Sequence, residues 1–577
     1  MNSRFPRSLF MGYQLLIAGC ILSSCNFIGN EVDMIVHNAK IYSVNESWDV
    51  YEAMVIDDGK IIHMGRSADV LHDYASKNVI DAKGKFVYPG FIDAHCHFLG
   101  YGRTLQEVNL IGTKSFDEVI ERVVEHRKKF PDKKWIIGRG WDQNDWQPSS
   151  FNKEKSSQQP AVLDMNHFTI PFPDNEKLNE LFPDVPVALK RIDGHVLLVN
   201  QKALDLAGIT TETKVEGGYV QVVLGKLTGI LVDNATKFVE DIIPEYTVEE
   251  DTEALLDAQK NCFEVGLTTV DDAGLLKKEI DLIKQLQQED KLRMRIYAML
   301  SDEDENFDYY LKNGIDTSDF LSVRAFKFYA DGALGSRGAC LLSPYEDIIH
   351  KKEYGFLLDS IAYFRMRAEQ LYDAGFQMCT HAIGDSANRM MLDVYSAVLG
   401  GMNDKRWRIE HAQVVHKNDV AMFGASGIIP SIQPTHATSD MPWAWQRLGR
   451  NRVKRAYAYS ELKDQLGMVA LGTDFPVEGI SPINTFYAAV VRKNIYGIPE
   501  EGFQTENALS RQDALSGITI WAALSNFEEH KKGSLEVGKF ADFVMLDKDL
   551  MTVSAEEMLS TKVVMTVVGG EVVFRQP

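Results

Sequence analysis

Two histidines separated by one residue end an apolar segment at His95-Cys96-His97. Side chains at positions i and i+2 of a β-strand point to the same face, so His95 and His97 can bind one metal ion while Cys96 points away. We therefore interpret Cys96 as a packed core thiol rather than a ligand. The pair alone is a weak signal, but it follows Pro89-Gly90 at a place where a strand is expected to end.

Four more side chains of metal-ligating type stand in or at the ends of apolar segments: Lys327, His381, His411 and Asp474. A single buried histidine has an ordinary explanation as a core residue with a hydrogen-bond partner. Lys327 is harder to explain in that way, because burying an unpaired ammonium group costs free energy. Carbamylation by carbon dioxide would turn Lys327 into an oxygen ligand. The whole set suits zinc or another divalent metal, with one or two ions per chain.

The segments that carry these residues alternate with stretches of helical pattern. Eight apolar, β-rich segments lie at 90–97, 267–272, 293–300, 325–329, 377–381, 408–411, 428–433 and 469–474. Eight strands alternating with helices predict an α/β protein with a (β/α)8 TIM barrel, here at residues 89–529. Active sites of such barrels lie at the carboxyl ends of the strands, which is where the candidate ligands stand.

The spacing of the segments predicts two further units. The long gap after the first segment predicts a subdomain inserted into the barrel at about residues 104–250, and His195 belongs to it. Short β-type runs with turn signals occur at both chain ends, at 34–44, 54–56, 60–64, 85–88, 543–546, 563–568 and 571–574. They predict a small β-sandwich built from residues 32–88 and 530–577.

Composition excludes several classes of protein. The net charge of the 577 residues is −21, whereas a nucleic-acid-binding protein needs a basic surface, so we expect no nucleic-acid partner. Hydrophobic residues make up 45% of the chain, which excludes wholesale disorder. The six cysteines are scattered along the chain and do not form a disulfide framework.

The first 25 residues resemble a bacterial lipoprotein signal peptide. Arg4 and Arg7 precede an apolar run at 9–22 that is short for a membrane span. Cys25, or less favourably Cys20, ends a sequence that resembles a cleavage and lipidation site. We expect an exported protein, lipid-anchored to a bacterial membrane and facing the periplasm or exterior. The alternative is an ordinary cleaved signal peptide.

Five stretches, in chain order, resemble the amidohydrolase superfamily, and more narrowly the branch that includes N-substituted formamide deformylases. They are Pro89 to His97, Lys327 with Ala330 to Arg337, Thr380 to Asp385, Ile409 to Gln413, and Gly472 to Val477. The stretch Gly533 to Phe543 resembles the family's return into the β-sandwich.

The resemblance implies a role for each candidate ligand. His95 and His97 would hold the more buried metal, and His381 and His411 the more exposed one. Lys327 would be the carbamylated bridge between them. Asp474 would be both a ligand and the group that transfers a proton.

The same resemblance implies hydrolysis of an amide or other C–N bond, peptide bonds in general excepted, by metal-activated water. His195 would contact the small-molecule amide substrate or the oxyanion, although a surface role is an equal alternative. Ester or lactone hydrolysis and deacetylation of an N-acyl amino acid are alternatives on the same fold. A non-catalytic surface lipoprotein that binds a small molecule is an alternative of another class. The sequence leaves the oligomeric state open.

Overall fold

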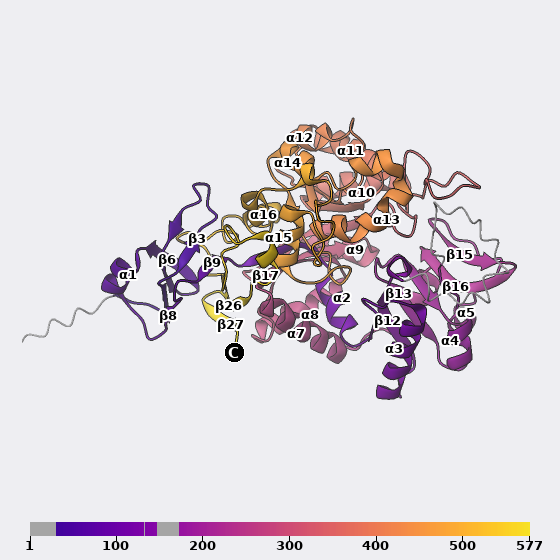
Figure 1. Cartoon of the computed structure of the whole chain (residues 1–577), viewed down its shortest axis with the longest axis horizontal. Helices are drawn as coiled ribbons and strands as arrows, with labels where there is room; N and C mark the ends of the chain where they lie inside the picture. The colour runs from indigo at the N-terminus through magenta and orange to yellow at the C-terminus, as the bar shows by residue number, and fades with distance from the viewer. Residues whose placement is uncertain (1–29, 132, 147–171) are drawn as a thin grey trace, which may run out of the picture.

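The centre of the molecule is a nearly closed barrel of parallel strands in the computed structural model, which describes residues 30–131, 133–146 and 172–577 (Figure 1). Each barrel strand pairs in parallel with the next. The strands are β10 (Phe91–Cys96), β17 (Leu267–Leu275), β18 (Arg295–Ser301), β20 (Leu321–Tyr329), β21 (Gln377–Ala382), β22 (Arg408–His411), β23 (Ile429–Ile432) and β24 (Ala470–Leu471). A short strand, β19 (Asp316–Thr317), pairs antiparallel with β20. The predicted α/β class and TIM barrel are confirmed.

The first and last barrel strands approach each other closely at Gly472. A Cβ atom at this position would lie 2.6 Å from the backbone nitrogen of His95, so only glycine fits. Two residues later, the backbone N–H of Asp474 donates to the carbonyl oxygen of His95 at 2.8 Å. The closure of the barrel therefore places Asp474 beside the histidines of β10.

Helices follow the barrel strands and form an outer layer (Figure 1). They include α7 (Val248–Glu264), α8 (Lys277–Gln288), α9 (Asp304–Asn313), α10 (Ile361–Ala374), α11 (Asp385–Leu399), α12 (Ala421–Ala425), α13 (Pro434–Arg452), α14 (Tyr459–Leu466), α15 (Pro482–Val491), α16 (Arg511–Gly517) and α17 (Ile520–Ser525). Helix α7 shows why they form: Thr247 and Glu250 make a capping box at its start. Its buried residues Ala254, Leu255, Ala258 and Cys262 recur at helical spacing and face the barrel core.

A six-stranded sheet lies between the first two barrel strands in the sequence and at one end of the molecule, on the right of Figure 1. Its strands, in spatial order, are β11 (Val108–Asn109), β12 (Ile136–Trp141), β13 (Val187–Arg191), β14 (Val196–Val199), β16 (Lys226–Asp233) and β15 (Gly218–Val223). Helix α2 (Phe98–Thr104) leads into this region, which also contains α3 (Phe116–Lys129), α4 (Glu176–Leu181), α5 (Gln201–Leu206) and α6 (Lys237–Glu240). Its buried apolar residues form clusters separate from the barrel core.

Two sheets lie at the opposite end of the molecule (Figure 1). The four-stranded sheet has the order β6 (Lys60–Gly65), β5 (Ala53–Asp57), β2 (Met34–His37) and β8 (Val79–Asp81). The six-stranded sheet has the order β27 (Glu571–Arg575), β26 (Val563–Val568), β25 (Phe543–Leu546), β9 (Phe86–Pro89), β3 (Lys40–Tyr42) and β4 (Val50–Tyr51). The smaller elements are β1 (Asn30–Glu31), α1 (Ser67–Asp73), β7 (Tyr74–Ala75) and α18 (Ala555–Met558). The prediction of a sheet built from both chain ends is confirmed.

One detail of these sheets differs from the sequence prediction. A single strand was expected over residues 34–44, but the structure has two strands, β2 and β3, which belong to different sheets. Asn38 lies between them with a φ of 53°, in the left-handed region. Asparagine tolerates this conformation better than most residues, so the chain turns there and passes from one sheet to the other.

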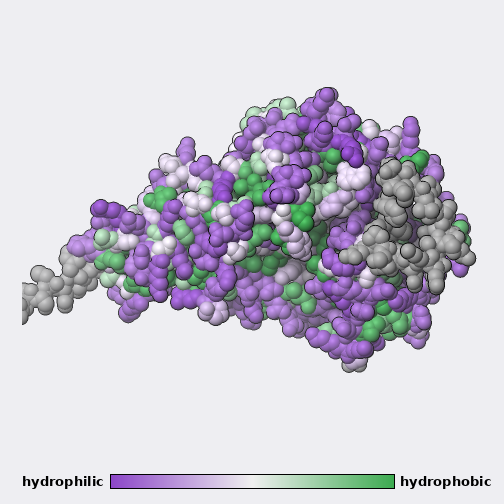
Figure 2. Space-filling model, viewed as in Figure 1, coloured by the Kyte–Doolittle hydropathy of each residue, from purple (hydrophilic) through white to green (hydrophobic). Residues whose placement is uncertain are grey.

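Hydrophilic residues cover most of the face shown in Figure 2. Among the described residues, no helix combines the length and the apolar character needed to cross a bilayer. Cys20 and Cys25, the two predicted lipidation sites, lie outside the described residues.

Asp549 ties the two chain ends together. Its carboxylate accepts hydrogen bonds from Tyr42 Oη and Tyr88 Oη, each at 2.9 Å, and from Lys40 Nζ at 2.9 Å. Asp549 itself is only 6% exposed. Burial acts to raise the pKa of Asp549, but the hydrogen bonds from Lys40 and the two tyrosines outweigh it and lower the pKa.

We expect Asp549→Ala to destabilise the protein by about 2–4 kcal/mol, because it leaves two tyrosine hydroxyls without their acceptor. A carboxylate with a lowered pKa stabilises the fold above its unfolded pKa and loses this effect as the pH falls through its folded pKa. The difference in melting temperature from wild type should therefore be full at pH 7 and shrink below about pH 4. Tyr42→Phe, which removes one donor and leaves the carboxylate, should cost less. A full-sized difference at pH 3 would contradict this role.

Candidate metal centre

The candidate ligands meet at the carboxyl ends of the barrel strands. One nitrogen or oxygen atom from each of His95, His411 and Asp474 lies within 4.8 Å of the others. The Nε2 atom of His97 lies 3.2 Å from Asp474 Oδ1. The ends of β10 and β22 and the loop after β24 therefore converge on one point.

The fourth and fifth barrel strands add two more residues to this point. Lys327 Nζ, from β20, lies 3.0 Å from His95 Nε2. The ring of His381, from β21, has its centroid 4.6 Å from that of His411. The structure thus brings all six residues suggested as ligands into one cluster, which is buried except for part of His97.

Three of the histidines present Nε2 to the cluster, because Nδ1 faces an oxygen behind it. The pairs are His95 with Glu410 Oε2 at 2.6 Å, His97 with the carbonyl oxygen of Ala273 at 2.9 Å, and His411 with Gln433 Oε1 at 2.7 Å. An Nδ1–H that donates to such an oxygen leaves the lone pair of Nε2 free for a metal.

Burial keeps the imidazoles in the form that binds metal. It lowers the pKa of His95 to about 4 and holds the pKa of His381 and of His411 well below the usual range. Only a neutral histidine offers a lone pair to a cation. These side chains are therefore ready to act as ligands at neutral pH.

Two buried polar atoms in the cluster, Nε2 of His381 and Oδ1 of Asp474, have no hydrogen-bond partner among the described residues. In addition, His97 Nε2 lies 3.2 Å from the same carboxylate oxygen. Such an arrangement is costly unless a cation lies between the atoms. Imidazole nitrogens and carboxylate oxygens are the ligands that zinc and similar divalent metals prefer. The residues present thus fit a divalent metal.

Asp474 is held as a carboxylate. Burial acts to raise its pKa, but the ring of His97 and the neighbouring His95 and His411 outweigh burial and keep the pKa well below its usual value. Its backbone φ is 63°, and that of His411 is 71°. Non-glycine residues rarely adopt such values, and this strain, about 1–3 kcal/mol for each residue, is typical of functional sites.

Lys327 lies inside the barrel with 1% of its surface exposed. Burial lowers the pKa of its ammonium group. No carboxylate of the described residues forms an ion pair with it, and its close contacts are His95 and the ring of Tyr329, whose centroid lies 4.8 Å away. The neutral amine, which such burial favours, is the form that reacts with carbon dioxide.

A buried ion network stands behind His95. Arg408 donates to Glu410 Oε1 at 2.7 Å and to Asp271 Oδ2 at 2.9 Å. The positive charge of Arg408 and the nearby His95 outweigh burial and lower the pKa of Glu410. Glu410 therefore stays ionised and fixes the ring of His95 through Nδ1.

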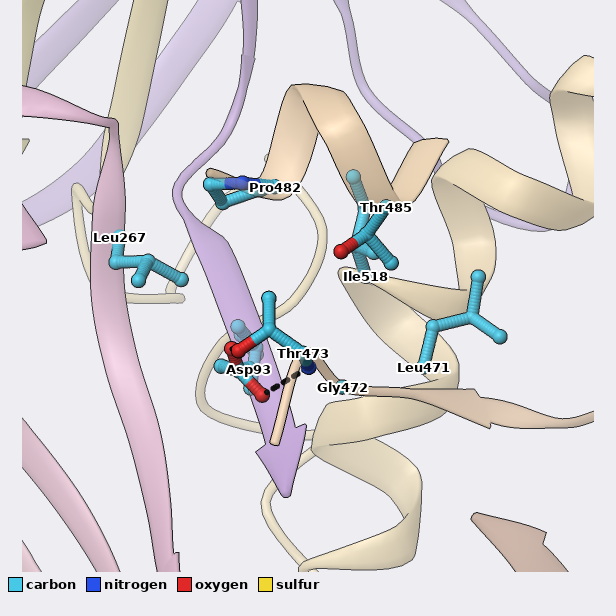
Figure 3. Close-up of a pocket in the computed structure, with 9 residues that line it drawn as sticks. Asp93, Leu267, Leu471, Gly472, Thr473, Pro482, Thr485 and Ile518 are labelled. Atoms are coloured by element: carbon cyan, nitrogen blue, oxygen red, sulfur yellow. Dashed lines mark hydrogen bonds between the residues drawn. The ribbon is translucent and has the colours of Figure 1, made fainter. Parts of the chain in front are cut away.

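Asp93 connects two segments of the site through hydrogen bonds. Its carboxylate accepts hydrogen bonds from the backbone N–H of Thr473, at 3.0 Å, and from Thr473 Oγ1, at 2.7 Å (Figure 3). It also accepts from the backbone N–H of His95 at 3.2 Å. Asp93 thus joins the segment before Asp474 to the strand that carries His95.

His195 reaches the cluster from the inserted sheet. Its ring centroid lies 5.3 Å from that of His381, and its Nδ1 lies 2.7 Å from Asp233 Oδ1. The side chain of Asp233 is completely buried. Arg191 forms ion pairs with Asp193, next to His195 in the sequence, and with Asp142. The structure therefore places His195 beside the candidate ligands.

Sequence reasoning missed His436, near the start of α13. Its Nε2 is buried without a hydrogen-bond partner and lies 3.7 Å from Asp474 Oδ2. Its ring stacks at 5.9 Å, centroid to centroid, on that of His411. The signal was present in the sequence, because His436 stands shortly after the seventh apolar segment, as the other candidates stand at the ends of theirs.

Comparisons with known proteins agree with this geometry. The model of the amidohydrolase family matches residues 78–574. The chain is 30% identical over 570 residues to Protein LONG AFTER FAR-RED 3 of Arabidopsis thaliana, a match that covers 95% of this chain and 92% of the relative. It is 26% identical over 564 residues to N-substituted formamide deformylase of Arthrobacter pascens, with 93% and 97% covered.

A solved structure shares the same fold along nearly its whole length. It is an uncharacterized metal-dependent hydrolase from Pyrococcus horikoshii OT3, with a TM-score of 0.70 and 27% sequence identity. The match covers 90% of this chain and 99% of that one. The arrangement of barrel and sheets is therefore shared with a metal-dependent hydrolase.

Proposed function

The chain belongs to the amidohydrolase family. We therefore propose that it uses a divalent metal to hydrolyse an amide or other C–N bond of a small molecule. At the level of the family it is a metal-dependent hydrolase. The observation that carries the finer proposal is the cluster of His95, His411 and Asp474, with ligand atoms within 4.8 Å of one another. The orphaned Nε2 of His381 supports it.

The ligand set allows two ions. His95 and His97 would hold one, His381 and His411 the other, and a carbamate on Lys327 would bridge them. Asp474 would complete the first site. A bound divalent cation lowers the pKa of a water ligand towards neutrality and polarises a carbonyl oxygen.

The protein's own residues then direct the reaction. Asp474, held as a carboxylate, takes a proton from the attacking water as the oxygen forms its bond to the carbonyl carbon. It returns this proton to the nitrogen as the C–N bond breaks, which gives a carboxylic acid and an amine. Burial acts to lower the pKa of His195, but the hydrogen bond to Asp233 and its charge outweigh burial and raise the pKa. In its protonated form, His195, fixed through Nδ1 by Asp233, would donate a hydrogen bond from its other nitrogen to the substrate oxygen.

The relative from Arthrobacter pascens suggests the first substrates to test, N-substituted formamides. We expect the metal-loaded protein to hydrolyse members of a panel of N-formyl and N-acyl amines, with release of the amine measured directly. Matched esters and lactones belong in the same panel. If the esters are hydrolysed faster than every amide, the protein is an ester hydrolase rather than an amide hydrolase. If no compound of the panel is hydrolysed, the result favours a binding protein.

His195 has a testable part in this scheme. We expect His195→Asn to lower kcat by about 10²-fold, the usual effect of removing one donor to a developing oxyanion. Metal content should stay at the wild-type level, because His195 lies outside the ligand set. The measurement is steady-state kinetics combined with metal analysis. An unchanged kcat would show that His195 has a structural role instead.

The location of the protein is a separate part of the proposal. The pattern of residues 1–25 supports export and lipid anchoring to a bacterial membrane, through Cys25 in preference to Cys20. Metabolic labelling with a fatty acid should mark the wild-type protein and the Cys20→Ala variant but not the Cys25→Ala variant. Labelling of Cys25→Ala but not of Cys20→Ala would show that Cys20 is the anchor. If neither the wild type nor the variants are labelled, lipid anchoring is contradicted.

A further inference from the structure

Arg139 of the inserted sheet lies beside the loop that carries His195. Its Nη2 donates to the carbonyl oxygen of Ile192 at 3.0 Å. A Cβ atom on Gly194 would lie 3.3 Å from Nη2, so the guanidinium packs against the residue that precedes His195. Of the acids around it, Asp474 is the one whose charge acts most strongly on Arg139. The guanidinium therefore packs against the loop that carries His195, and Asp474 acts on it electrostatically.

A second site residue locates Arg139 from the other side. The positive charge of Arg139 acts on the hydroxyl of Tyr329, and the ring of Tyr329 lies 5.5 Å from that of His381, centroid to centroid. Arg139 thus packs against the residue before His195, whose ring lies 5.3 Å from that of His381, and it is close enough to act electrostatically on Tyr329. This position puts Arg139 on the side of the inserted sheet that faces the cluster.

Arg139 has no carboxylate partner of its own among the described residues. Its Nε is buried without a hydrogen-bond acceptor, and the bond to Ile192 uses only one of its five N–H groups. Burial lowers its pKa, which shows that the surroundings do not compensate the charge fully. The contrast is Arg191 on the next strand, whose guanidinium pairs with both Asp142 and Asp193.

A guanidinium removed from water normally pairs with a planar anion, because its parallel N–H groups match the two oxygens of a carboxylate. We infer that Arg139 binds a carboxylate group of the substrate, so that the preferred substrates are amides that carry a carboxylate near the scissile bond. This inference rests on the proposed function and names the substrate class of the same site. N-acyl and N-formyl amino acids are members of that class.

Two further acidic residues, Asp440 and Glu478, both interact electrostatically with His436. Asp440 accepts hydrogen bonds from Tyr457 Oη at 2.8 Å and from Gln413 at 3.1 Å, and burial raises its pKa to about 7. Burial also raises the pKa of Glu478. The negative charge of Asp440 is therefore reduced near neutral pH, whereas a guanidinium stays protonated.

The decisive experiment compares two substrates that differ only in the carboxylate. N-formylphenylalanine and N-formylphenethylamine share the same amide and the same ring. We expect the wild-type, metal-loaded enzyme to favour the acid by about 30-fold or more in kcat/KM, which is the scale of a desolvated charge pair. Arg139→Met should remove most of this preference, because kcat/KM should fall far more for the acid than for the neutral amide.

Two control variants separate recognition from other effects. Arg139→Lys keeps the charge without the planar fork and should retain only part of the preference. Lys128→Met, on α3, removes one positive charge from an exposed position and should leave the preference unchanged. If Arg139→Met lowers kcat/KM for both substrates equally, or for neither, Arg139 supports the loop at 192–195 and the inference is overturned.

A binding measurement decides the question without turnover. Calorimetric titration with 3-phenylpropanoate and with 3-phenylpropan-1-ol compares the acid with its neutral counterpart. We expect Arg139→Met to weaken the binding of the acid about 30-fold and to leave the affinity for the alcohol unchanged. Equal affinities of wild type and variant for the acid would contradict the inference. Should neither formamide be hydrolysed, this titration still tests Arg139, and only the proposed reaction fails.

Discussion

Asp474→Asn is expected to lower kcat by about 10³- to 10⁴-fold, the upper range for loss of a general base and acid. Asparagine has nearly the same shape and can still offer an oxygen to a metal, but it cannot accept the proton of the attacking water. The structure supports this choice because Asp474 is an ionised carboxylate, with an orphaned Oδ1, at the convergence of the barrel strands. Metal content and melting temperature should stay close to those of wild type.

The measurement is steady-state kinetics on protein whose metal content has been determined in the same preparation. Thr473→Ser is the matched control, because the neighbouring hydroxyl that donates to Asp93 is kept. It should stay within about threefold of wild type. Turnover of Asp474→Asn within tenfold of wild type would show that another group moves the proton.

His95→Ala is expected to remove both metal and activity, with kcat reduced by at least about 10³-fold. His95 contacts two other candidate ligands, because its Nε2 lies 3.0 Å from Lys327 Nζ and 3.6 Å from Asp474 Oδ1. Its removal also leaves Glu410 ionised and buried without the imidazole at 2.6 Å. Some loss of thermal stability should therefore accompany the loss of metal.

The next residue provides a control on the same strand. Cys96 is also fully buried, but its thiol faces the carbonyl oxygen of Asp271 at 3.4 Å and packs in the core, away from the ligands. Cys96→Ala should keep metal and activity. The two site variants should thus differ in metal content, because Asp474→Asn is expected to keep the metal and His95→Ala to lose it. Full metal content in His95→Ala would place the ion elsewhere.

The barrel was predictable from the sequence because its signals are local. Each strand is an apolar run that ends in a polar residue, and the predicted run 377–381 corresponds to β21 at Gln377–Ala382. Lys327 stood out because a charged side chain interrupts such a run. The parallel arrangement then places the strand ends, and with them His381 and His411, at one mouth of the barrel.

The contacts that complete the site were not predictable in the same way, because they join residues far apart in the chain. Glu410 and His95 are separated by 315 positions, and no local pattern reveals that they touch. Asp233, which fixes His195, also follows an apolar run, Ile230 to Val232, but nothing in that run shows that it meets His195. Arg139 looks like any strand arginine until the fold shows that it has no carboxylate partner among the described residues.

The central claim is that these side chains together hold a divalent ion, and the most direct test is anomalous diffraction from crystals of zinc-loaded protein, recorded on both sides of the zinc absorption edge. The account predicts a zinc peak about 2.0–2.1 Å from the Nε2 atoms of His95 and His97, or of His381 and His411. Density for a carbamate on Lys327 would accompany two peaks. A fully loaded crystal whose zinc lies away from this cluster, with these histidines free of metal, would contradict the account.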